Sequence, residues 1–256
     1  MVTIIKVGGA VLEDPASLDI FIRGFLSIEE PKVLVHGGGR SATALAKNLN
    51  IPSVMVEGRR ITDTAMLDIV TMVYAGLINK KLVANLQGKG INALGMAGCD
   101  LNVIKSRKRP PVNGVDFGFV GDIETVNSDI LLSLIRQGIT PIIAPLTHNC
   151  EGQLLNTNAD SIASAVAIAL SGSVDTTLIY CFEKEGVLSN PEDDISVIAE
   201  ITAGNYEKLK ASGTVTGGMI PKIENALAAV SKGVGKIIIK KYSSLGNSKS
   251  GTVIHN

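Results

Sequence analysis

The chain has 256 residues, of which 45% are hydrophobic, so it is long enough to bury one sizeable core. Its 24 Lys and Arg balance its 24 Asp and Glu, which argues against a nucleic-acid binder that depends on bulk positive charge. No secretory signal is visible, and the most apolar helical segment, residues 162–170, is too short to span a bilayer. We therefore expect a cytoplasmic protein with no membrane partner. The three cysteines form no CxxC pair and the three histidines lack metal-ligand spacing, so we expect no metal held by the protein itself.

Short β-branched runs alternate with longer helical patterns along the chain. Several of the runs are almost continuously apolar, which is typical of strands buried on both faces. The alternation predicts an α/β fold, a three-layer αβα sandwich around a central, mainly parallel sheet. Strands are expected over residues 3–7, 32–36, 54–56, 141–144, 177–180 and 236–239. Helices are expected over residues 15–27, 41–49, 64–87, 128–137, 160–170, 203–210 and 221–232.

Residues 105–122 break the alternation. The segment contains KSRKRPP followed by GVDFGFVGD, a pattern that indicates a hairpin or lid at the surface. Its basic run is interpreted as a solvated loop rather than a binding site. No linker or repeat divides the chain, so we expect one continuous domain with two lobes, residues 1–170 and 171–256.

Two glycine-rich turns follow the first two expected strands, where ligands bind in open parallel sheets. One turn is Lys6-Val7-Gly8-Gly9 and the other is His36-Gly37-Gly38-Gly39. Glycines let the backbone approach a ligand, and free N–H groups at a helix start attract anions. The second turn also satisfies the loose dinucleotide fingerprint GxGxxA, with Glu57 about the right distance further on. A Rossmann oxidoreductase is therefore an alternative at this point.

Three further polar groups flank expected helices or strands. The run Asn156-Thr157-Asn158-Ala159-Asp160 precedes a helix, and capping by Asn158 would explain only one of its polar residues. Lys222 follows the pair Gly217-Gly218 near another helix start, where a positive charge opposes the helix dipole. Arg59 and Arg60 follow the strand over residues 54–56. Together with the glycine turns, these groups favour phosphoryl transfer, which needs positioning and positive charge more than a covalent nucleophile.

Seven motifs, taken in order, resemble the amino acid kinase family over essentially the whole chain. The motifs are KVGGAVL, VHGGGR, GRRITD, DFGFVGDIETVN, EGQLLNTNAD, GGMIPK and GTVI. The dinucleotide fingerprint does not account for KVGG, NTNAD or GGMxxK. Within the family the resemblance is to members that phosphorylate an acylated glutamate. It implies phosphoryl transfer from ATP, accompanied by Mg²⁺, to the γ-carboxylate of N-acetyl-L-glutamate in arginine biosynthesis. That carboxylate is already a nucleophile at pH 7, so no general base is required.

The resemblance also implies roles for individual residues. Lys6 and Lys222 would stabilise the transition state, Asp160 would organise the two lysines, and Gly9 would donate its backbone N–H to the transferring phosphoryl group. The residues expected to hold the acylated amino acid are Gly38, Gly39, Arg60, Asn156 and Asn158. The residues expected to hold ATP are Glu183, Lys184, Glu185, Gly186, Val187, Leu188, Thr214, Val215, Thr216, Gly217 and Gly218. The first lobe would then bind the acceptor and form a dimer contact, and the second would bind ATP.

Some positions depart from the family pattern. Glu183-Lys184-Glu185 replaces the usual Asp-Val-Pro/Ser, and Arg59 stands where an apolar residue is more common. Arg59 either faces solvent or a surface acid, or it pairs with a second carboxylate, as in N-succinyl-L-glutamate. That acceptor, a non-catalytic nucleotide-binding regulatory module and a Rossmann oxidoreductase are the alternatives. The chain starts at its first strand, whereas arginine-inhibited relatives carry a preceding helix. We therefore expect a homodimer insensitive to arginine, with residues 64–87 as a candidate dimer surface.

Overall fold

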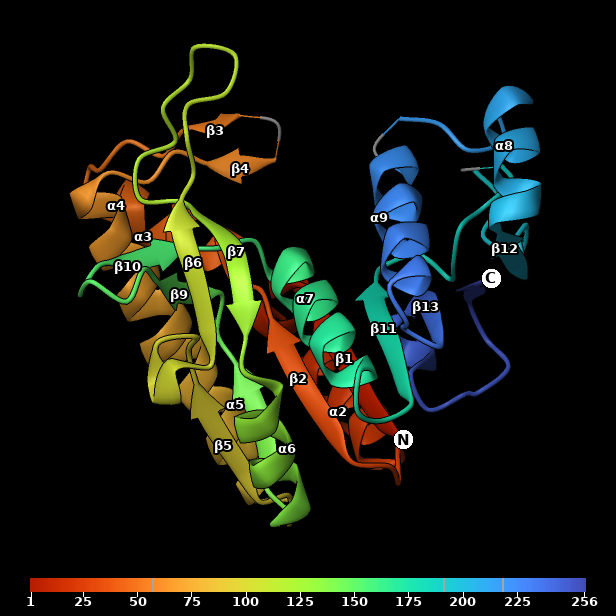
Figure 1. Cartoon of the computed structure of the whole chain (residues 1–256), viewed down its shortest axis with the longest axis horizontal. Helices are drawn as coiled ribbons and strands as arrows, with labels where there is room; N and C mark the ends of the chain where they lie inside the picture. The colour runs from red at the N-terminus through yellow and green to blue at the C-terminus, as the bar shows by residue number, and fades with distance from the viewer. Residues whose placement is uncertain (57, 191, 218) are drawn as a thin grey trace.

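The computed structural model describes residues 1–56, 58–190, 192–217 and 219–256. An eight-stranded sheet runs through the molecule, and its neighbouring strands are parallel except for one antiparallel pair, β13 and β14 (Figure 1). The strand order is β12 (Glu200–Thr202), β14 (Thr252–His255), β13 (Lys236–Lys241), β11 (Thr176–Phe182), β1 (Val2–Val7), β2 (Lys32–His36), β8 (Thr140–Ile143) and β5 (Ala93–Met96). The first four strands in this order come from residues 171–256 and the last four from residues 1–170. The assignment of the two halves to separate functional lobes stays a prediction.

Two smaller sheets lie beside the half formed by residues 1–170. One has the order β10 (Leu154–Asn156), β9 (Leu146–His148), β6 (Ile104–Lys108) and β7 (Gly121–Val126). The other pairs β3 (Met55–Val56) with β4 (Arg59–Arg60). Strands β6 and β7 are antiparallel, which confirms the hairpin expected over residues 105–122. The loop that joins them extends from the edge of the molecule (Figure 1).

Helices cover both faces of the central sheet. One layer holds α1 (Gly9–Glu13), α2 (Pro15–Leu26), α3 (Gly39–Asn48), α4 (Thr64–Val70), the π-helix η1 (Thr71–Ile78) and α5 (Asn79–Gln87). The other layer holds α6 (Ser128–Arg136), α7 (Ala159–Ser171), α8 (Ala203–Ala211) and α9 (Met219–Ser231). The short 3₁₀ segments η2 (Asp100–Asn102) and η3 (Tyr242–Ser244) complete the described elements. In the described part of the chain, no helix has both the length and the apolar character needed to cross a bilayer.

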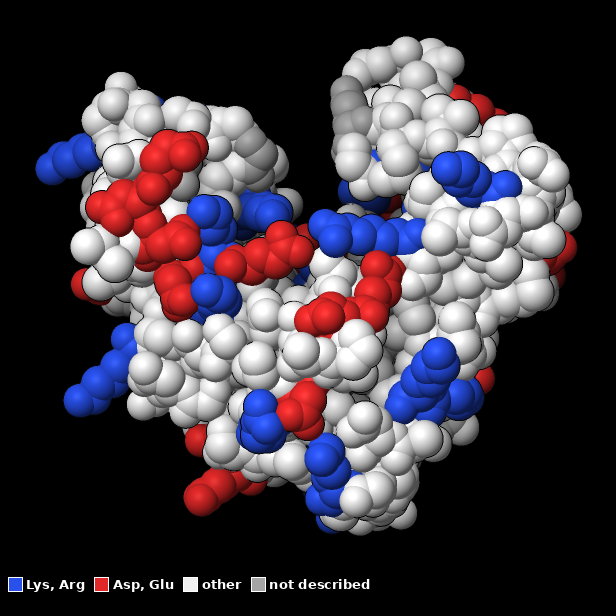
Figure 2. Space-filling view, turned by 180° about the vertical axis from the view of Figure 1, so that it is seen from behind, with Lys and Arg blue, Asp and Glu red and all other residues white. Residues whose placement is uncertain are grey.

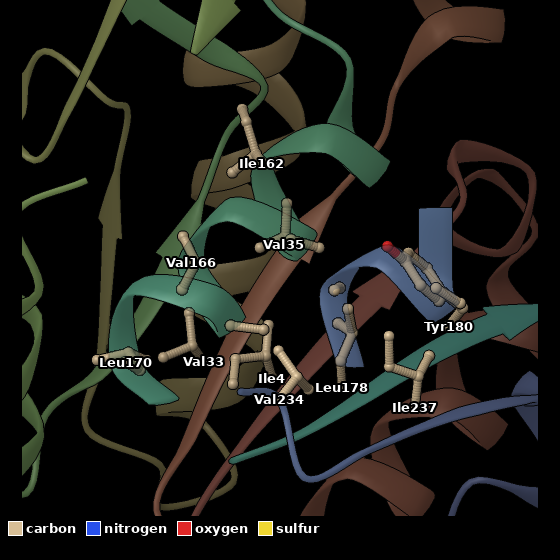
Figure 3. Packing of buried hydrophobic residues seen from close by; sticks show 14 of the residues in the cluster. Ile4, Val33, Val35, Ile162, Val166, Leu170, Leu178, Tyr180, Val234 and Ile237 are labelled. Atoms are coloured by element: carbon tan, nitrogen blue, oxygen red, sulfur yellow. The ribbon is translucent and has the colours of Figure 1, made fainter. Parts of the chain in front are cut away.

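Successive residues of the central strands point to opposite faces, so one strand supplies two cores. Ile4 packs in the core beneath α7, while its neighbour Ile5 packs in the core beneath α2. Ile162 and Val166 of α7 lie beside Val33 and Val35 of β2 in this core (Figure 3). Every residue of β1 and β2 is buried, as the continuous apolar runs predicted. The expected three-layer sandwich is therefore confirmed.

The helix expected over residues 64–87 is present but changes its winding midway. Its middle turn, η1, is a π-helix between two α-helical segments. A π-helix inserts an extra residue into the turn and re-aims the side chains that follow it. Strands β5, β12 and β14 of the central sheet were not predicted, because the short apolar run of β5 contains a glycine and those of β12 and β14 are bounded by polar residues.

Candidate functional site

A cleft of about 1020 Å³ opens between the two halves of the chain. Its walls come from β7 and α7 on one side and from β11 and α9 on the other. A smaller hollow of about 170 Å³ lies beside it, and Gly58, Arg59 and Asn158 line both spaces. Seen from behind, the molecule has a notch with Lys and Arg side chains gathered at its base (Figure 2). The site therefore lies at the carboxyl ends of parallel strands, as expected for this class of sheet.

Lys6 and Asp160 form the central ion pair of the site. The Nζ atom of Lys6, near the end of β1, lies 2.7 Å from Oδ1 of Asp160. Asp160 sits in the first turn of α7, where Asn158 caps the helix by accepting a hydrogen bond from the Ser161 N–H at 3.0 Å. A carboxylate in this turn is stabilised by the positive end of the helix dipole. The buried ammonium of Lys6 thus has the paired, oriented counter-charge that burial demands.

Lys222 reaches the same cleft from the opposite half of the chain. It lies in the first turns of α9 and lines the cleft with Asp160. Partial desolvation lowers the pKa of Lys222, Asp160 opposes this shift, and the positive charge of Lys6 adds to it. The structure therefore places Lys6, Asp160 and Lys222 close enough to influence one another's charge, while their catalytic roles stay predictions.

The two glycine turns, which follow β1 and β2, contact each other beside the cluster of Lys6, Asp160 and Lys222. The Gly37 N–H donates to the carbonyl oxygen of Val7 at 2.9 Å, which ties the second turn to the end of β1. A β-carbon on Gly9 would lie only 3.1 Å from both Cα and N of Gly38. Gly38 and Gly39 then begin α3 and line the smaller hollow. Side chains are excluded here by close packing of backbone on backbone, which leaves N–H groups near the site.

Arg60 and Asn156 lie at the smaller hollow. Arg60 is only 6% exposed, and its guanidinium donates to the Gly39 carbonyl oxygen and to Thr43 Oγ1, both at 2.8 Å, and also contacts the Ser53 hydroxyl. The Asn156 amide donates to Thr62 Oγ1 at 3.0 Å. Arg60 is thus held rigidly against the second glycine turn.

Arg59 differs from its neighbour because it is only half-buried and lines both spaces. Burial and the nearby Arg109 lower the pKa of Arg59, and Asp122 opposes them. Asp122 is itself paired with Arg109 at 2.6 Å. Asp122 is therefore a surface acid near Arg59, but its carboxylate is already paired with Arg109.

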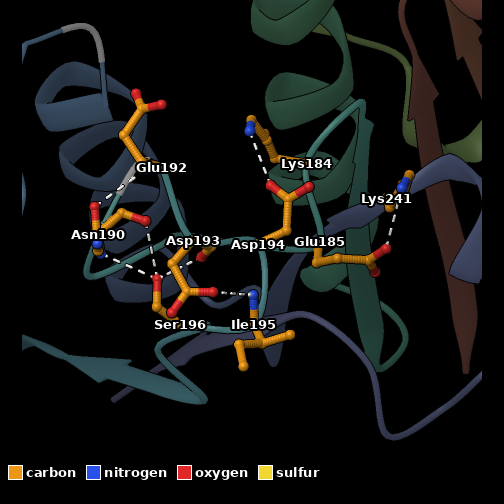
Figure 4. Close-up of polar contacts among 9 residues, drawn as sticks. All are labelled: Lys184, Glu185, Asn190, Glu192, Asp193, Asp194, Ile195, Ser196 and Lys241. Carbon is orange, nitrogen blue, oxygen red and sulfur yellow. Dashed lines mark hydrogen bonds and ion pairs between the residues drawn. The ribbon is translucent and has the colours of Figure 1, made fainter.

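Three charged residues in the segment 183–188, which is expected to bind ATP, form ion pairs. Lys184 pairs with Asp194 at 2.8 Å and Glu185 with Lys241 at 3.2 Å (Figure 4), while Glu183 lies 3.8 Å from Arg40. Each of these charged side chains has a partner of opposite charge, and the pairs of Lys184 and of Glu183 lie at the exposed surface.

The other residues expected to bind ATP vary in exposure. Val187 and Val215 are buried in the core, and Gly186 packs against Thr252. None of the described residues among 183–188 and 214–217 lines the two spaces defined above. Gly218, also assigned to ATP, and Glu57, from the dinucleotide fingerprint, lie outside the described residues.

A buried polar chain behind the second glycine turn was not predicted as part of the site. His36 is fully buried, its Nδ1 lies 2.9 Å from the Gly37 carbonyl oxygen, and Asn79 Nδ2 lies 3.1 Å from its Nε2. Asn79 also donates to the carbonyl oxygen of Ile142 at 2.8 Å, which fixes the direction of its amide. The proton of His36 is therefore on Nδ1 and is donated to Gly37. Burial lowers the pKa of His36 from 6.5 to about 4, so this histidine is neutral and positions the turn.

Residues 1–241 match the amino acid kinase family. The chain belongs to that family. A relative from Phocaeicola vulgatus, named acetylglutamate kinase, is 55% identical over 252 residues, which span 98% of this chain and 97% of the relative. A similarly named relative from Cytophaga hutchinsonii is 51% identical over 94% of this chain and 92% of its own length.

Solved structures agree with the family assignment. The carbamate kinase of Giardia lamblia bound to AMP-PNP superimposes with a TM-score of 0.70 at 16% identity, covering 100% of this chain and 98% of that chain. At that identity the likeness shows the fold alone. The three-layer sandwich is therefore the amino acid kinase fold. The individual site residues stay predictions, because neither comparison assigns a role to a residue of this chain.

Proposed function

We propose that the protein transfers the γ-phosphoryl group of ATP to the γ-carboxylate of N-acetyl-L-glutamate, as a step of arginine biosynthesis. The observation that supports this most directly is the cluster of Lys6, Asp160 and Lys222 in the cleft, in a chain 55% identical to a relative named acetylglutamate kinase. The substrate form of the nucleotide is MgATP, with the metal entering on the phosphates.

In the proposed reaction a γ-carboxylate oxygen of the acceptor attacks the γ-phosphorus of ATP. The new bond joins that oxygen to phosphorus, and the bond between phosphorus and the β–γ bridging oxygen breaks, so that ADP leaves with its electron pair. Negative charge spreads over the transferring group and grows on the leaving oxygen. Lys6 and Lys222 would neutralise this charge, and Asp160 would hold the Lys6 ammonium in place at 2.7 Å.

The two substrates would occupy different parts of the site. The smaller hollow, between Arg60, Asn156 and the second glycine turn, would take the acylated amino acid, because the Arg60 guanidinium can receive a carboxylate. The larger cleft would take the phosphates of ATP. The transferring γ-phosphoryl group would lie where this cleft meets the smaller hollow, so that Gly9, Gly38 and Gly39 could donate backbone N–H groups to it. The adenosine part would lie toward residues 183–188 and 214–218. These placements are proposals.

The alternatives are not favoured. The curated relatives at 51–55% identity over nearly the whole chain are named acetylglutamate kinase, which does not favour an N-succinylglutamate kinase, a non-catalytic regulatory module or a Rossmann oxidoreductase. The glycine turn after β2 is explained by the amino acid kinase fold. A homodimer, its insensitivity to arginine and a cytoplasmic location stay predictions. Exposed Met72 and Leu77 make the helix over residues 64–87 a reasonable dimer surface, testable by sedimentation.

The test is ADP release by the purified protein with MgATP and each of glutamate, N-acetylglutamate and N-succinylglutamate at matched concentrations. We expect turnover with N-acetylglutamate and formation of an acyl phosphate that hydroxylamine traps. Lys6→Met should abolish turnover, whereas Lys236→Met, an exposed lysine at the amino end of β13, should not. Preference for another acceptor, or binding of ATP without turnover, would contradict the proposal.

A further inference from the structure

Phe182 is the last residue of β11 and lines the cleft between the two halves of the chain. The ammonium of Lys222 lies 4.1 Å from the centre of its ring, and the ammonium of Lys6 lies 5.5 Å from the same point. Both distances are within the range in which a cation is attracted to an aromatic ring. One aromatic ring is therefore shared by the two lysines of the site.

Two ammonium groups, those of Lys6 and Lys222, share the single carboxylate of Asp160, and this ring can offset part of the remaining positive charge. Among the described residues, the charged groups that act on the pKa of Lys222 are Asp160 on α7 and Lys6 on β1. Asp160 makes its close contact with Lys6, at 2.7 Å, and acts on Lys222 only from a greater distance. Tyr180, the other titratable group at this point, is neutral because burial, reinforced by Asp160, raises its pKa. The negative face of an aromatic ring attracts a cation without adding a second carboxylate to the phosphate site.

The ring of Phe182 is itself held in place. Tyr180 lies two residues earlier on β11, so its side chain emerges on the same face of the strand. The two rings are stacked with their centres 6.1 Å apart and their planes 21° from parallel. The Tyr180 hydroxyl donates to the carbonyl oxygen of Asp160 at 3.3 Å, which joins the aromatic pair to the first turn of α7. The ring, the carboxylate and both lysines thus form one connected unit.

We propose that Phe182 is a positioning residue that holds the Lys222 ammonium beside Lys6 and Asp160 and stabilises its positive charge through its ring. This inference rests on the proposed function for the importance of the two lysines to catalysis. The contact itself is independent of that function. Phe182 binds no substrate in this scheme and acts through the lysines alone.

The test compares a variant that keeps the ring with variants that remove it. Phe182→Tyr keeps the aromatic face, while Phe182→Leu and Phe182→Met keep apolar bulk without it. We expect the two aliphatic variants to lower kcat about three- to tenfold and to change KM for either substrate less than about twofold. Their alkaline loss of kcat should begin about half a unit to one unit lower in pH, because Lys222 loses its proton more easily. Phe182→Tyr should restore both the rate and the pH profile.

A second measurement needs no catalytic activity. The pH dependence of covalent labelling of Lys222 by an amine-reactive reagent, read by peptide mass spectrometry with Lys236 as internal reference, reports its ionisation directly. We expect the labelling curve of Lys222 to move to lower pH in the two aliphatic variants and to stay in place in Phe182→Tyr. An unchanged labelling curve in the aliphatic variants, or an equal shift of the curve in all three variants, would overturn the inference. If wild-type protein lacked turnover with N-acetylglutamate, the proposed function would fail while the labelling curves still decided the role of Phe182.

Discussion

Gly95 offers a sharp test of the buried chain behind the second glycine turn. It lies on β5, at the edge of the central sheet and away from the cleft. A β-carbon there would collide with Oδ1 of Asn79, and it would also lie 2.8 Å from Val83 Cγ2 and 2.9 Å from Lys80 Nζ. Asn79 cannot turn aside without losing its bonds to His36 and to the Ile142 carbonyl oxygen. The substitution Gly95→Ala should therefore act on the site from a distance.

The expected size of the effect follows from these contacts. Overpacking of a core by one methyl group costs about 1–3 kcal/mol. Loss of one or two buried hydrogen bonds of Asn79 adds about 1 kcal/mol each. Gly95→Ala should thus lower the free energy of unfolding by about 2–5 kcal/mol and the Tm by roughly 4–20 °C. It should also lower kcat, because His36 no longer fixes the Gly37 carbonyl at 2.9 Å.

The assay is urea unfolding followed by two probes, with kcat measured in parallel. Gly76→Ala is the matched control, because Gly76 lies on the same long helix and an added β-carbon there meets nothing within 4 Å. The decisive comparison places Gly95→Ala in an Asn79→Ala background, where the collision with Asn79 is gone and only the contacts with Val83 and Lys80 remain. Its cost should be smaller there by at least about 1 kcal/mol, the share of the lost Asn79 hydrogen bonds. An equal cost in both backgrounds, or no cost in the wild type, would refute the reasoning.

Three further predictions concern ionisation and charge in the site. The pKa of His36 is about 4 in the folded protein and 6.5 ordinarily, so the folded state binds fewer protons than the unfolded state between these pH values. The contribution of His36 to the free energy of unfolding is therefore complete above pH 6.5 and is lost as the pH falls toward 4. His36→Gln should flatten that part of the curve of unfolding free energy against pH, by about 3 kcal/mol in total, and an unchanged slope would count against the assignment. Lys222→Met should lower kcat at least about 100-fold with little change in the Tm, since Lys222 is exposed and would act on charge formed during transfer; a change in KM alone would argue for a binding role. Arg60→Lys should raise KM for the acceptor at least about tenfold and leave KM for ATP within about twofold, because a lysine cannot replace the fork of donors that would receive the acceptor carboxylate. A larger effect on KM for ATP would relocate the acceptor site.

The sequence predicted most of the central sheet and its helices because their signals are local. The apolar runs of β1 and β2 identify strands buried on both faces, and Asn158 was correctly interpreted as a helix cap. The short strands β12 and β14 were not found, because their pairing partners rather than their own residues make them strands. The π-helical turn before Asn79 was not found either, since no residue pattern in that helix marks it.

The sequence by itself determined which residue types stand at the ends of the strands. Glycine turns and the Asn/Asp run are visible near strand ends and helix starts, because backbone conformation and helix capping restrict the residues allowed there, and Lys6 and Lys222 stand beside such signals. The tertiary structure alone decided which of them meet. Lys6, Asp160, Phe182 and Lys222 come from four separate elements, and only the packing of those elements sets the distances that control their charges. The neutral state of His36 has the same origin, because burial is a property of the folded chain and not of the histidine.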